Sequence, residues 1–260
     1  MSLRICVLGS GSSGNSIYVA SERTQILIDA GLSGREIERR LAAIGVDVRR
    51  IDAVCVTHEH DDHRAALAAL QRRHGLALYG NAGTIEAIER EERLRGLTWN
   101  VFLTGSPFRA GDLIVEPFSV PHDSYDPVGF VVRNGPSRAG IVTDMGMPTG
   151  LIRERLRHCG AILLESNHDE QMLRDAARPW SLKQRVAGRQ GHLSNRQAGE
   201  LLAEVAGPEL RSVFLVHLSA ECNRPELAAG AVRAALAERG HGGVEVKLTY
   251  PDRVSDWGAA

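Results

Sequence analysis

The chain has 260 residues, 43% of them hydrophobic and 24% charged, and a formal net charge of −1. This balance favours one globular domain over residues 1–260 and excludes a protein that binds nucleic acid through an overall positive charge, although it leaves local basic patches open. No apolar run approaches the roughly 18 residues of a membrane span, the N-terminus lacks the layout of a signal peptide, and the four cysteines form no Cys-x-x-Cys pair. We therefore expect a cytoplasmic protein with reduced, buried thiols and no membrane contact.

The N-terminal part of the chain is predicted to form a strand meander. Leu3–Leu8 reads as a buried strand that enters the loop Gly9–Gly14, which matches the G-x-G-x-x-G pattern of dinucleotide-binding proteins. That pattern requires a helix to begin at the glycines, whereas Ser16–Ala20 alternates like a strand and Thr24–Ala30 reads as another. A tight turn between strands is therefore favoured over a nicotinamide site.

Helices and strands alternate along the rest of the chain. Up to residue 100 we predict strands over 51–57 and 76–79 and helices over 34–44, 64–74 and 84–95. Beyond it we predict strands over 113–120, 128–133, 139–143, 161–164, 212–216 and 244–248, helices over 151–157 and 225–239, and helical patches between 169 and 205. Two comparable halves of this kind predict an α/β (α+β) fold of two sheets packed face to face with helices outside.

The segment from His58 to His63, at the end of the strand predicted over 51–57, concentrates potential metal ligands. Four of its six residues offer nitrogen or oxygen ligands to a borderline-soft cation: His58, His60, Asp62 and His63. A polar helix cap is the simplest structural explanation, but a cap needs one Asp rather than three histidines beside it. The segment therefore predicts a metal site.

Other polar residues also follow predicted strand ends, where loops at one edge of a sheet assemble a site from distant parts of the chain. They are Asp29, His122, Asp144, Glu165 and His217. The number of ligands predicts two metal ions: one held by His58, His60 and His122, one by Asp62, His63 and His217, with Asp144 as the bridge. Two cations ~3.5–4 Å apart share a water, lower its pKa towards roughly 7 and stabilise both oxygens of a displacement at phosphorus.

These residues together resemble the metallo-beta-lactamase superfamily. The resemblance covers nearly the whole chain and rests on Asp29, the cluster from His58 to His63, His122, Asp144 and His217. It implies a four-layer αββα sandwich with a metal pair at one edge. It also implies that Asp29 supports the metal ligands from behind, a role that suits a carboxylate near imidazole N–H groups.

The C-terminal part is similar to the tail of the tRNA 3′-processing ribonucleases of that superfamily, ribonuclease Z. The similarity lies in Gly191–Asn195 and in the His-x-Ser that begins at His217. It implies that Glu165 orients His192 at the scissile phosphate, where the imidazole protonates the leaving oxygen or contacts the phosphate. With Asp62, these two residues are the expected catalytic groups. The chain departs from those ribonucleases because it holds no insertion long enough for a tRNA-gripping arm.

Four stretches together closely resemble the YycJ/WalJ family of stand-alone bacterial hydrolases: Leu8–Ser16, Val120–Asp123, Glu165–Asp169 and Gly191–Asn195. This resemblance implies a metal-dependent exonuclease that acts on DNA from the 5′ end, with DNA repair as its setting. The N-terminal loop would then border the site and contact substrate through Ser12, Ser13 and Asn15, since small residues and free backbone N–H groups suit a phosphate. A tight turn between strands explains the same loop equally well.

The segment from Arg174 to Arg196 is the most basic part of the chain. It holds six basic residues against the single acid Asp175: Arg174, Arg178, Lys183, Arg185, Arg189 and Arg196. Arginine binds phosphate in a fork, and an exposed tryptophan such as Trp180 stacks on an unpaired base. We therefore predict substrate contacts by Arg178, Lys183 and Arg185, and by His168, Ser194 and Asn195. A solvated helix face with Trp180 in the core is the alternative.

These observations predict a two-metal phosphodiesterase, in first place a 5′-to-3′ DNA exonuclease, with DNA preferred over RNA as the partner and Zn or Mn as the metal. Three alternatives stay open: an RNA-processing nuclease, a hydrolase of a thioester, lactone or cyclic nucleotide on the same fold, and a regulatory module with structural metals. The small-substrate hydrolase needs no basic approach surface, so its activity would be insensitive to salt. A structural zinc site is closed and rich in thiolates, unlike this ligand set.

Overall fold

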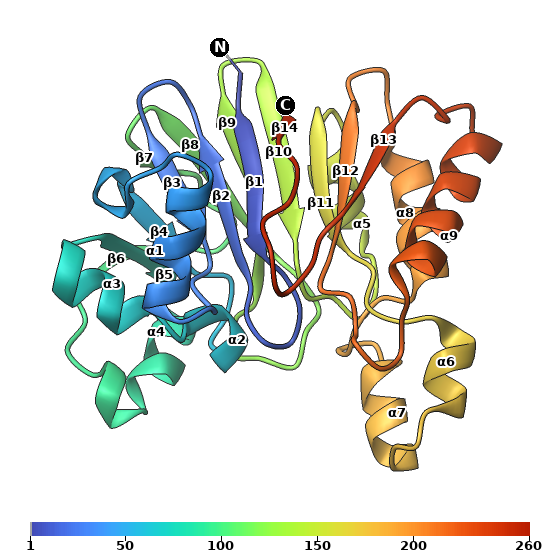
Figure 1. Cartoon of the computed structure of the whole chain (residues 1–260), viewed down its shortest axis with the longest axis horizontal. Coiled ribbons are helices and arrows are strands. Elements are labelled where there is room, and N and C mark those ends of the chain that lie inside the picture. Colours follow the sequence, from blue (N-terminus) through green and yellow to red (C-terminus); the bar gives the residue numbers. More distant parts are fainter. Residues whose placement is uncertain (1) are drawn as a thin grey trace.

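The computed structural model describes residues 2–260 and contains two seven-stranded sheets with helices on their outer faces (Figure 1). The first sheet has the order β14-β1-β2-β3-β4-β5-β6, with β1 Arg4–Gly9, β2 Ser16–Ala20, β3 Gln25–Ile28, β4 Ala53–Cys55, β5 Ala77–Asn81, β6 Trp99–Phe102 and β14 Gly258–Ala259. The second has the order β13-β12-β11-β10-β9-β8-β7, with β7 Phe108–Ala110, β8 Leu113–Ser119, β9 Val128–Asn134, β10 Ser137–Val142, β11 Ala161–Glu165, β12 Ser212–Val216 and β13 Glu245–Leu248.

The helices divide between the two sheets in the order of the chain. They are α1 Gly34–Ala43, α2 Asp61–Arg64, α3 Leu67–His74, α4 Ala82–Glu89, α5 Gly150–Leu156, α6 Glu170–Asp175, α7 Trp180–Val186, α8 Asn195–Val205 and α9 Pro225–Glu238, with short 3₁₀ turns at Val48–Arg50 and Glu92–Leu94. Figure 1 shows α1 and α3 against the first sheet and α8 and α9 against the second. No helix within residues 2–260 is long and apolar enough to cross a membrane.

Apolar side chains fill three layers between these elements. The central layer joins the inner faces of both sheets, for example Val19 of the first and Phe130 of the second. One outer layer packs Leu67 of α3 against the first sheet, and the other packs Leu201 of α8 and Val232 of α9 against the second. The molecule therefore has four layers in space, a layer of helices on the outer face of each of two packed sheets, which confirms the predicted four-layer sandwich.

Strand β1 illustrates why the sequence of a central strand is apolar throughout. Alternate side chains of a strand point to opposite faces of its sheet. Ile5 and Val7 lie in the central layer, whereas Cys6 and Leu8 lie in the outer layer under the helices. Because both faces of the sheet are covered, the strand reads as a continuous apolar run rather than as an alternating one.

Both sheets contain a run of four parallel strands, β3-β4-β5-β6 in the first and β10-β11-β12-β13 in the second. The remaining pairs are antiparallel in both sheets, so the two halves have comparable architecture, as predicted. The carboxyl ends of parallel strands meet at one edge, where α/β folds gather their ligands. This arrangement explains why polar residues that follow different strands can form one site.

Three short strands were not predicted. Strands β6 and β7 have four and three residues, and β6 exposes Val101, so neither carries a clear apolar signal. The strand at 244–248 was expected to be the last of the chain, but Gly258–Ala259 pairs with β1 after it. A two-residue strand exists only through its partner, which local sequence does not reveal.

The helix predicted over 64–74 is interrupted after Arg64. The backbone N–H of Ala66 donates to the carbonyl of Ala30, and the N–H of Ala30 donates to the carbonyl of His63, each at 2.8 Å. These bonds replace helical ones, so α2 ends at Arg64 and α3 begins at Leu67. The interruption ties the metal-ligand segment to the end of β3.

Candidate metal centre

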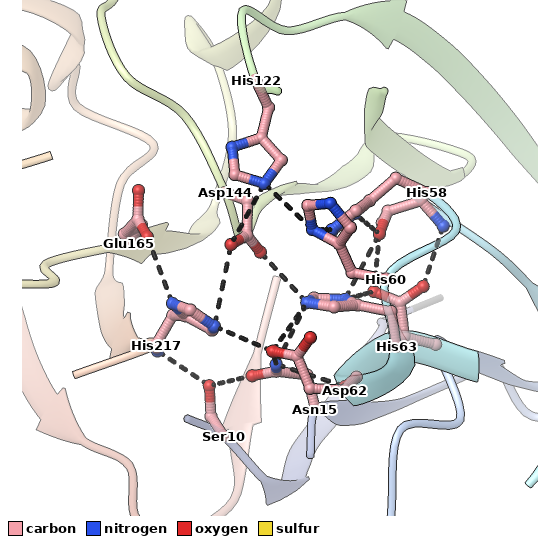
Figure 2. A network of polar contacts seen from close by, with 12 residues as sticks. Ser10, Asn15, His58, His60, Asp62, His63, His122, Asp144, Glu165 and His217 are labelled. Atoms are coloured by element: carbon pink, nitrogen blue, oxygen red, sulfur yellow. Dashed lines mark hydrogen bonds and ion pairs between the residues drawn. The ribbon is translucent and has the colours of Figure 1, made fainter. Parts of the chain in front are cut away.

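Residues far apart in the sequence converge at the edge where the parallel strands end (Figure 2). Asp29 follows β3, the segment from His58 to His63 follows β4 and includes α2, and Asp144 follows β10. Glu165 ends β11 and His217 follows β12. Each side chain is therefore fixed by the end of a buried strand, which holds a site more firmly than a free loop does.

Three imidazoles from two loops form the first group of candidate ligands. Nε2 of His58 lies 3.1 Å from Nδ1 of His60, which lies 3.3 Å from Nε2 of His122. All three ring nitrogens lie within 4.8 Å of one another. Burial lowers the pKa of His58 and of His60 below the ordinary histidine value, which favours the neutral form that binds metal ions.

A second group combines a carboxylate with two imidazoles. Oδ2 of Asp62 lies 3.2 Å from Nε2 of His217 and 3.5 Å from Nε2 of His63. The side-chain amide of Asn15 donates to Oδ2 of Asp62 at 3.2 Å. Burial alone would raise the pKa of Asp62, but its contacts with His217 and His63 outweigh burial and lower it. Asp62 is therefore ionised and ready to bind a cation.

Asp144 lies between the two groups. Its Oδ2 lies 3.2 Å from Nε2 of His63, and its Oδ1 lies 3.6 Å from Nε2 of His217 and 3.8 Å from Nε2 of His122. The side chain is 4% exposed, and within residues 2–260 its Oδ2 makes no hydrogen bond of good geometry. A buried carboxylate oxygen without such a bond is a favourable place for a metal ion.

The electrostatics of the centre also suit cations. Burial by itself would lower the pKa of His217, but Asp144, Asp62 and Glu165 raise it to about 10. Burial is likewise outweighed at His63, where Asp29 and Asp144 raise the pKa. Carboxylates that stabilise a buried imidazolium also stabilise a divalent cation in its place. The residues present therefore fit divalent metal ions.

Asp29 holds the centre from behind. Its Oδ1 accepts from the backbone N–H of Thr57 and its Oδ2 from the Thr57 hydroxyl, both at 2.8 Å, and Oδ2 also lies 2.7 Å from Nδ1 of His63. Burial raises the pKa of this carboxyl, although His63 opposes that effect. Because Asp29 contacts Nδ1, Nε2 of His63 faces Asp62 and Asp144 on the other side of the ring, an arrangement that suits a supporting role for Asp29.

Asp29→Asn is expected to weaken metal binding by about 10- to 100-fold, because an amide holds the ring of His63 less firmly than a carboxylate does. Competition with a chromogenic chelator measures this change. Asp52→Asn is the matched control, since the Asp52 carboxylate accepts from the backbone N–H of Gln25 at an exposed position, and this variant should leave metal affinity unchanged. Equal metal affinity in the Asp29 variant and the wild type would show that Asp29 has no supporting role.

Glu165 and His192 form a pair beside the two ligand groups. Oε1 of Glu165 lies 2.7 Å from Nδ1 of His192, while Oε2 accepts from the backbone N–H groups of Met145 and Leu193, both at 3.0 Å. Burial would lower the pKa of His192, but Glu165 outweighs it and raises the pKa. Together with Asp144 and the nearby His217, the pair also forms a further cluster of potential ligands.

The centre opens into a cavity of about 330 Å³. His60, Asp62, His122, Asp144, His192 and His217 line it on the metal side, and Ser12, Asp123, Arg178 and Arg185 line its other walls. Arg185 donates to Asp123 at 2.6 Å. Arg178 pairs with Glu221. Two guanidinium groups and the candidate metal ligands thus face one space, which suits an anionic substrate.

The residues predicted to bind substrate do not all lie in this cavity. Ser12, Arg178 and Arg185 line it, whereas Lys183, His168 and Ser194 line a second cavity. Ser13 is exposed and lines neither.

Two asparagines predicted to contact substrate lie in buried hydrogen-bond networks. Asn15 is buried and braces Asp62. Asn195 is also buried, bonded to Ser166 and Asn223, and lines neither cavity. Both amides therefore already have hydrogen-bond partners within the protein.

Sequence reasoning missed several supporting residues. The hydroxyl of Ser10 accepts from the backbone N–H of His217 at 2.8 Å, and its own proton goes to Asn15 at 2.9 Å. Thr57 contacts Asp29 and lies 2.9 Å from Nδ1 of His58. Asp123 appeared in the sequence analysis only as the last residue of the stretch Val120–Asp123, without a role of its own. The contacts of Ser10 with His217 and of Thr57 with Asp29 join residues far apart in the chain, and no local pattern marks them.

Comparisons with known proteins agree with this geometry. The model of the beta-lactamase superfamily domain matches residues 24–218. Exodeoxyribonuclease YycJ of Bacillus anthracis is 34% identical over 249 residues, 93% of this chain and 92% of its own. Exodeoxyribonuclease WalJ of Streptococcus pneumoniae serotype 2 is 35% identical over 252 residues, 95% of this chain and 94% of its own.

More distant relatives and solved structures also resemble this chain. Ribonuclease Z of Bradyrhizobium diazoefficiens is 27% identical over 172 residues, 58% of this chain and 55% of its own. The crystal structure of the metallo-beta-lactamase fold protein YhfI from Bacillus subtilis superposes with a TM-score of 0.76 at 16% identity and covers all of both chains. The chain therefore belongs to the metallo-beta-lactamase superfamily, within the family of YycJ and WalJ, and is a metal-dependent hydrolase.

Proposed function

We propose that this hydrolase is a two-metal phosphodiesterase and, specifically, an exonuclease that degrades DNA from the 5′ end. One observation carries the proposal: a single cavity is lined by members of both ligand groups, by His192 of the Glu165–His192 pair, and by Arg178 and Arg185. Carbonyl substrates of a small hydrolase would not need two guanidinium groups beside the metal ligands, whereas a phosphodiester does.

Zinc or manganese is the proposed metal, because imidazole and carboxylate ligands suit either ion. His58, His60 and His122 would hold one ion and Asp62, His63 and His217 the other, with Asp144 in contact with both. Two bound divalent cations supply a water of lowered pKa and stabilise charge on the attacking and leaving oxygens.

The other residues of the cavity have separate roles in the proposal. Arg178 and Arg185 orient the phosphate through charge-assisted hydrogen bonds. His192 donates a proton to the leaving oxygen from Nε2, because Glu165 occupies its Nδ1. Ser12, at the rim of the cavity, contacts the phosphate from the N-terminal loop. Asp123 restrains Arg185 until substrate arrives.

The names of the relatives support DNA as the substrate, since both proteins that align along nearly the whole chain are exodeoxyribonucleases. The match to ribonuclease Z keeps RNA as the alternative substrate. The four cysteines are all buried and unpaired, which supports a reducing compartment, and hence the cytoplasm, as the place where the enzyme works.

Degradation of end-labelled single- and double-stranded DNA and RNA by the zinc- or manganese-loaded protein tests the proposal. We expect label at a 5′ end to be released first from DNA, with slower attack on RNA. Raising salt from about 50 to about 200 mM should slow cleavage at limiting substrate roughly tenfold, as two phosphate contacts, those of Arg178 and Arg185, require. Salt-insensitive hydrolysis of a small ester, with no cleavage of any polynucleotide, would contradict the proposal.

A further inference from the structure

A second cavity of about 330 Å³ lies on the other side of helix α7 from the metal centre. Side chains at 182, 185 and 186 line the first cavity, whereas those at 180, 183, 184 and 187 line the second. The second set follows the i, i+3, i+4, i+7 spacing of one helix face. Helix α7 is thus a wall with a cavity on each side, and Figure 1 shows it projecting with α6 beyond the two sheets.

Helix α7 does not contribute to the hydrophobic core. None of its seven residues is buried, and Trp180 is 67% exposed. Of the two alternatives for Trp180, an exposed side chain is confirmed and a place in the core is wrong. An exposed tryptophan that lines a cavity is available to pack against a bound molecule, and tryptophan is enriched among the residues that dominate binding energy.

The lining of the second cavity combines an apolar surface with hydrogen-bonding groups. Leu173, Ala187 and the ring of Trp180 supply the apolar part. His168 is 2% exposed, and within residues 2–260 its Nδ1 has no hydrogen-bond partner. A flat heterocycle with polar edges satisfies both kinds of lining at once, as a nucleobase does when it stacks on an aromatic ring.

Charge on the rim favours a phosphate next to that ring. Among the described residues, Arg174 and Lys183 have no carboxylate within 4.0 Å: Arg174 donates to the side chain of Gln171, and Lys183 donates to the carbonyl of Arg174. The one acid of the lining, Glu170, is paired with Arg196. The rim therefore keeps two cations available for a polyanion.

The two cavities are joined by the motif Gly191–Asn195. His192 lines the first and Ser194 the second, so about 7 Å of extended backbone separates them. His168 and Ser194 are bridged as parallel strand residues, which fixes the second cavity relative to the Glu165–His192 pair. A strand bound at the metal centre needs only a short path over α7 to reach the second cavity.

We propose that the second cavity is a nucleobase subsite, in which Trp180 stacks on an unpaired base of the strand whose phosphate lies at the metal centre, while Arg174 and Lys183 contact the adjoining phosphate. This inference rests on the proposed function, since it assigns a place to part of the same polynucleotide. It requires the strand to be unpaired at that base, so single-stranded ends or frayed ends are bound in preference to closed duplex.

The test combines Trp180→Ala with single-stranded DNA that lacks one base near the end attacked. In the wild type, removal of the base at the bound position should lower kcat/KM roughly tenfold or more, and Trp180→Ala should cause a similar loss on intact DNA. The variant should then be indifferent to the missing base, because the same contact has already been removed. Trp180→Phe should restore most of the activity, which separates stacking from damage to the fold.

Leu103→Ala is the matched control, because Leu103 is 71% exposed and lies beyond β6 on the other half of the molecule; it should respond to the missing base as the wild type does. If Trp180→Ala still loses activity when the base is missing, so that the two losses add, the proposed subsite is wrong, although the proposed exonuclease function still stands. If the wild type does not cleave DNA at all, the proposed function is wrong. Binding of the same oligonucleotides, measured by tryptophan fluorescence, then tests the subsite separately. Equal binding of intact and base-deleted strands would overturn the subsite.

Discussion

Asp62→Ala is expected to lower cleavage of DNA by the metal-loaded protein by about 10³-fold or more, because loss of a ligand removes the several kcal/mol that a metal ion contributes to the transition state. Asp62 shares its Oδ2 with His217, His63 and the amide of Asn15. The side chain is 22% exposed and lies outside the hydrophobic layers, so the fold should survive. His60→Ala should have the same effect through the other ligand group.

Asp61→Ala is the control for this prediction. Asp61 is the same residue type at the adjacent position, but its side chain is 71% exposed and pairs with the exposed Arg93 and with Arg64, which also contacts Glu91. An exposed ion pair contributes about 1 kcal/mol or less, and none of it to catalysis. Rates of DNA cleavage, with circular dichroism to check the fold, decide between the two positions. Full activity in purified Asp62→Ala would disprove the role of Asp62 as a ligand.

His192→Ala is expected to lower turnover by roughly 10²–10⁴-fold with metal content preserved, which is the range for loss of a general acid. Glu165 contacts Nδ1 of His192 at 2.7 Å, which leaves Nε2 for the substrate. Single-turnover rates, together with metal analysis of the purified variant, measure the effect. His241→Ala, in the loop after α9, is the control and should retain both metal and activity.

Metal content distinguishes the two possible roles of His192. Glu165, His192, Asp144 and His217 are close enough together to hold an ion themselves. If His192→Ala loses metal as well as activity, the residue is a ligand rather than a proton donor. Retained metal with unchanged turnover would exclude both roles.

The candidate metal centre was predictable because its signal is local. Three histidines and two aspartates within six residues, at the end of an apolar strand, are more than a polar helix cap needs. The later candidate ligands His122, Asp144 and His217 follow strand ends as well, and parallel strands bring such ends to one edge. The comparisons confirm the family that these residues suggested.

What could not be predicted depends on contacts between distant segments. The break after Arg64 arises from hydrogen bonds between residue 30 and residues 63 and 66, which no helical pattern reports. Asn15 was expected at the substrate, but it braces Asp62, because the folding of its loop decides which way the amide faces. Long-range hydrogen bonds of this kind override local propensity.

The basic segment from Arg174 to Arg196 was predicted only in part. Its charge was apparent from composition, but the separation of Lys183 and Arg185 onto opposite faces of α7 was overlooked. The helical period of residues 180–187 already contains that separation. The single-domain organisation expected over residues 1–260 stays a prediction.

The central claim is that two metal ions, held by two groups of ligands, act together in one cavity. Titration of the metal-stripped protein with zinc or manganese, with bound metal and cleavage of end-labelled DNA measured in the same samples, tests it most directly. We expect binding to saturate at about two ions per chain, as the two ligand groups require, and activity to rise chiefly with the second. Full activity with one ion per chain would contradict the account.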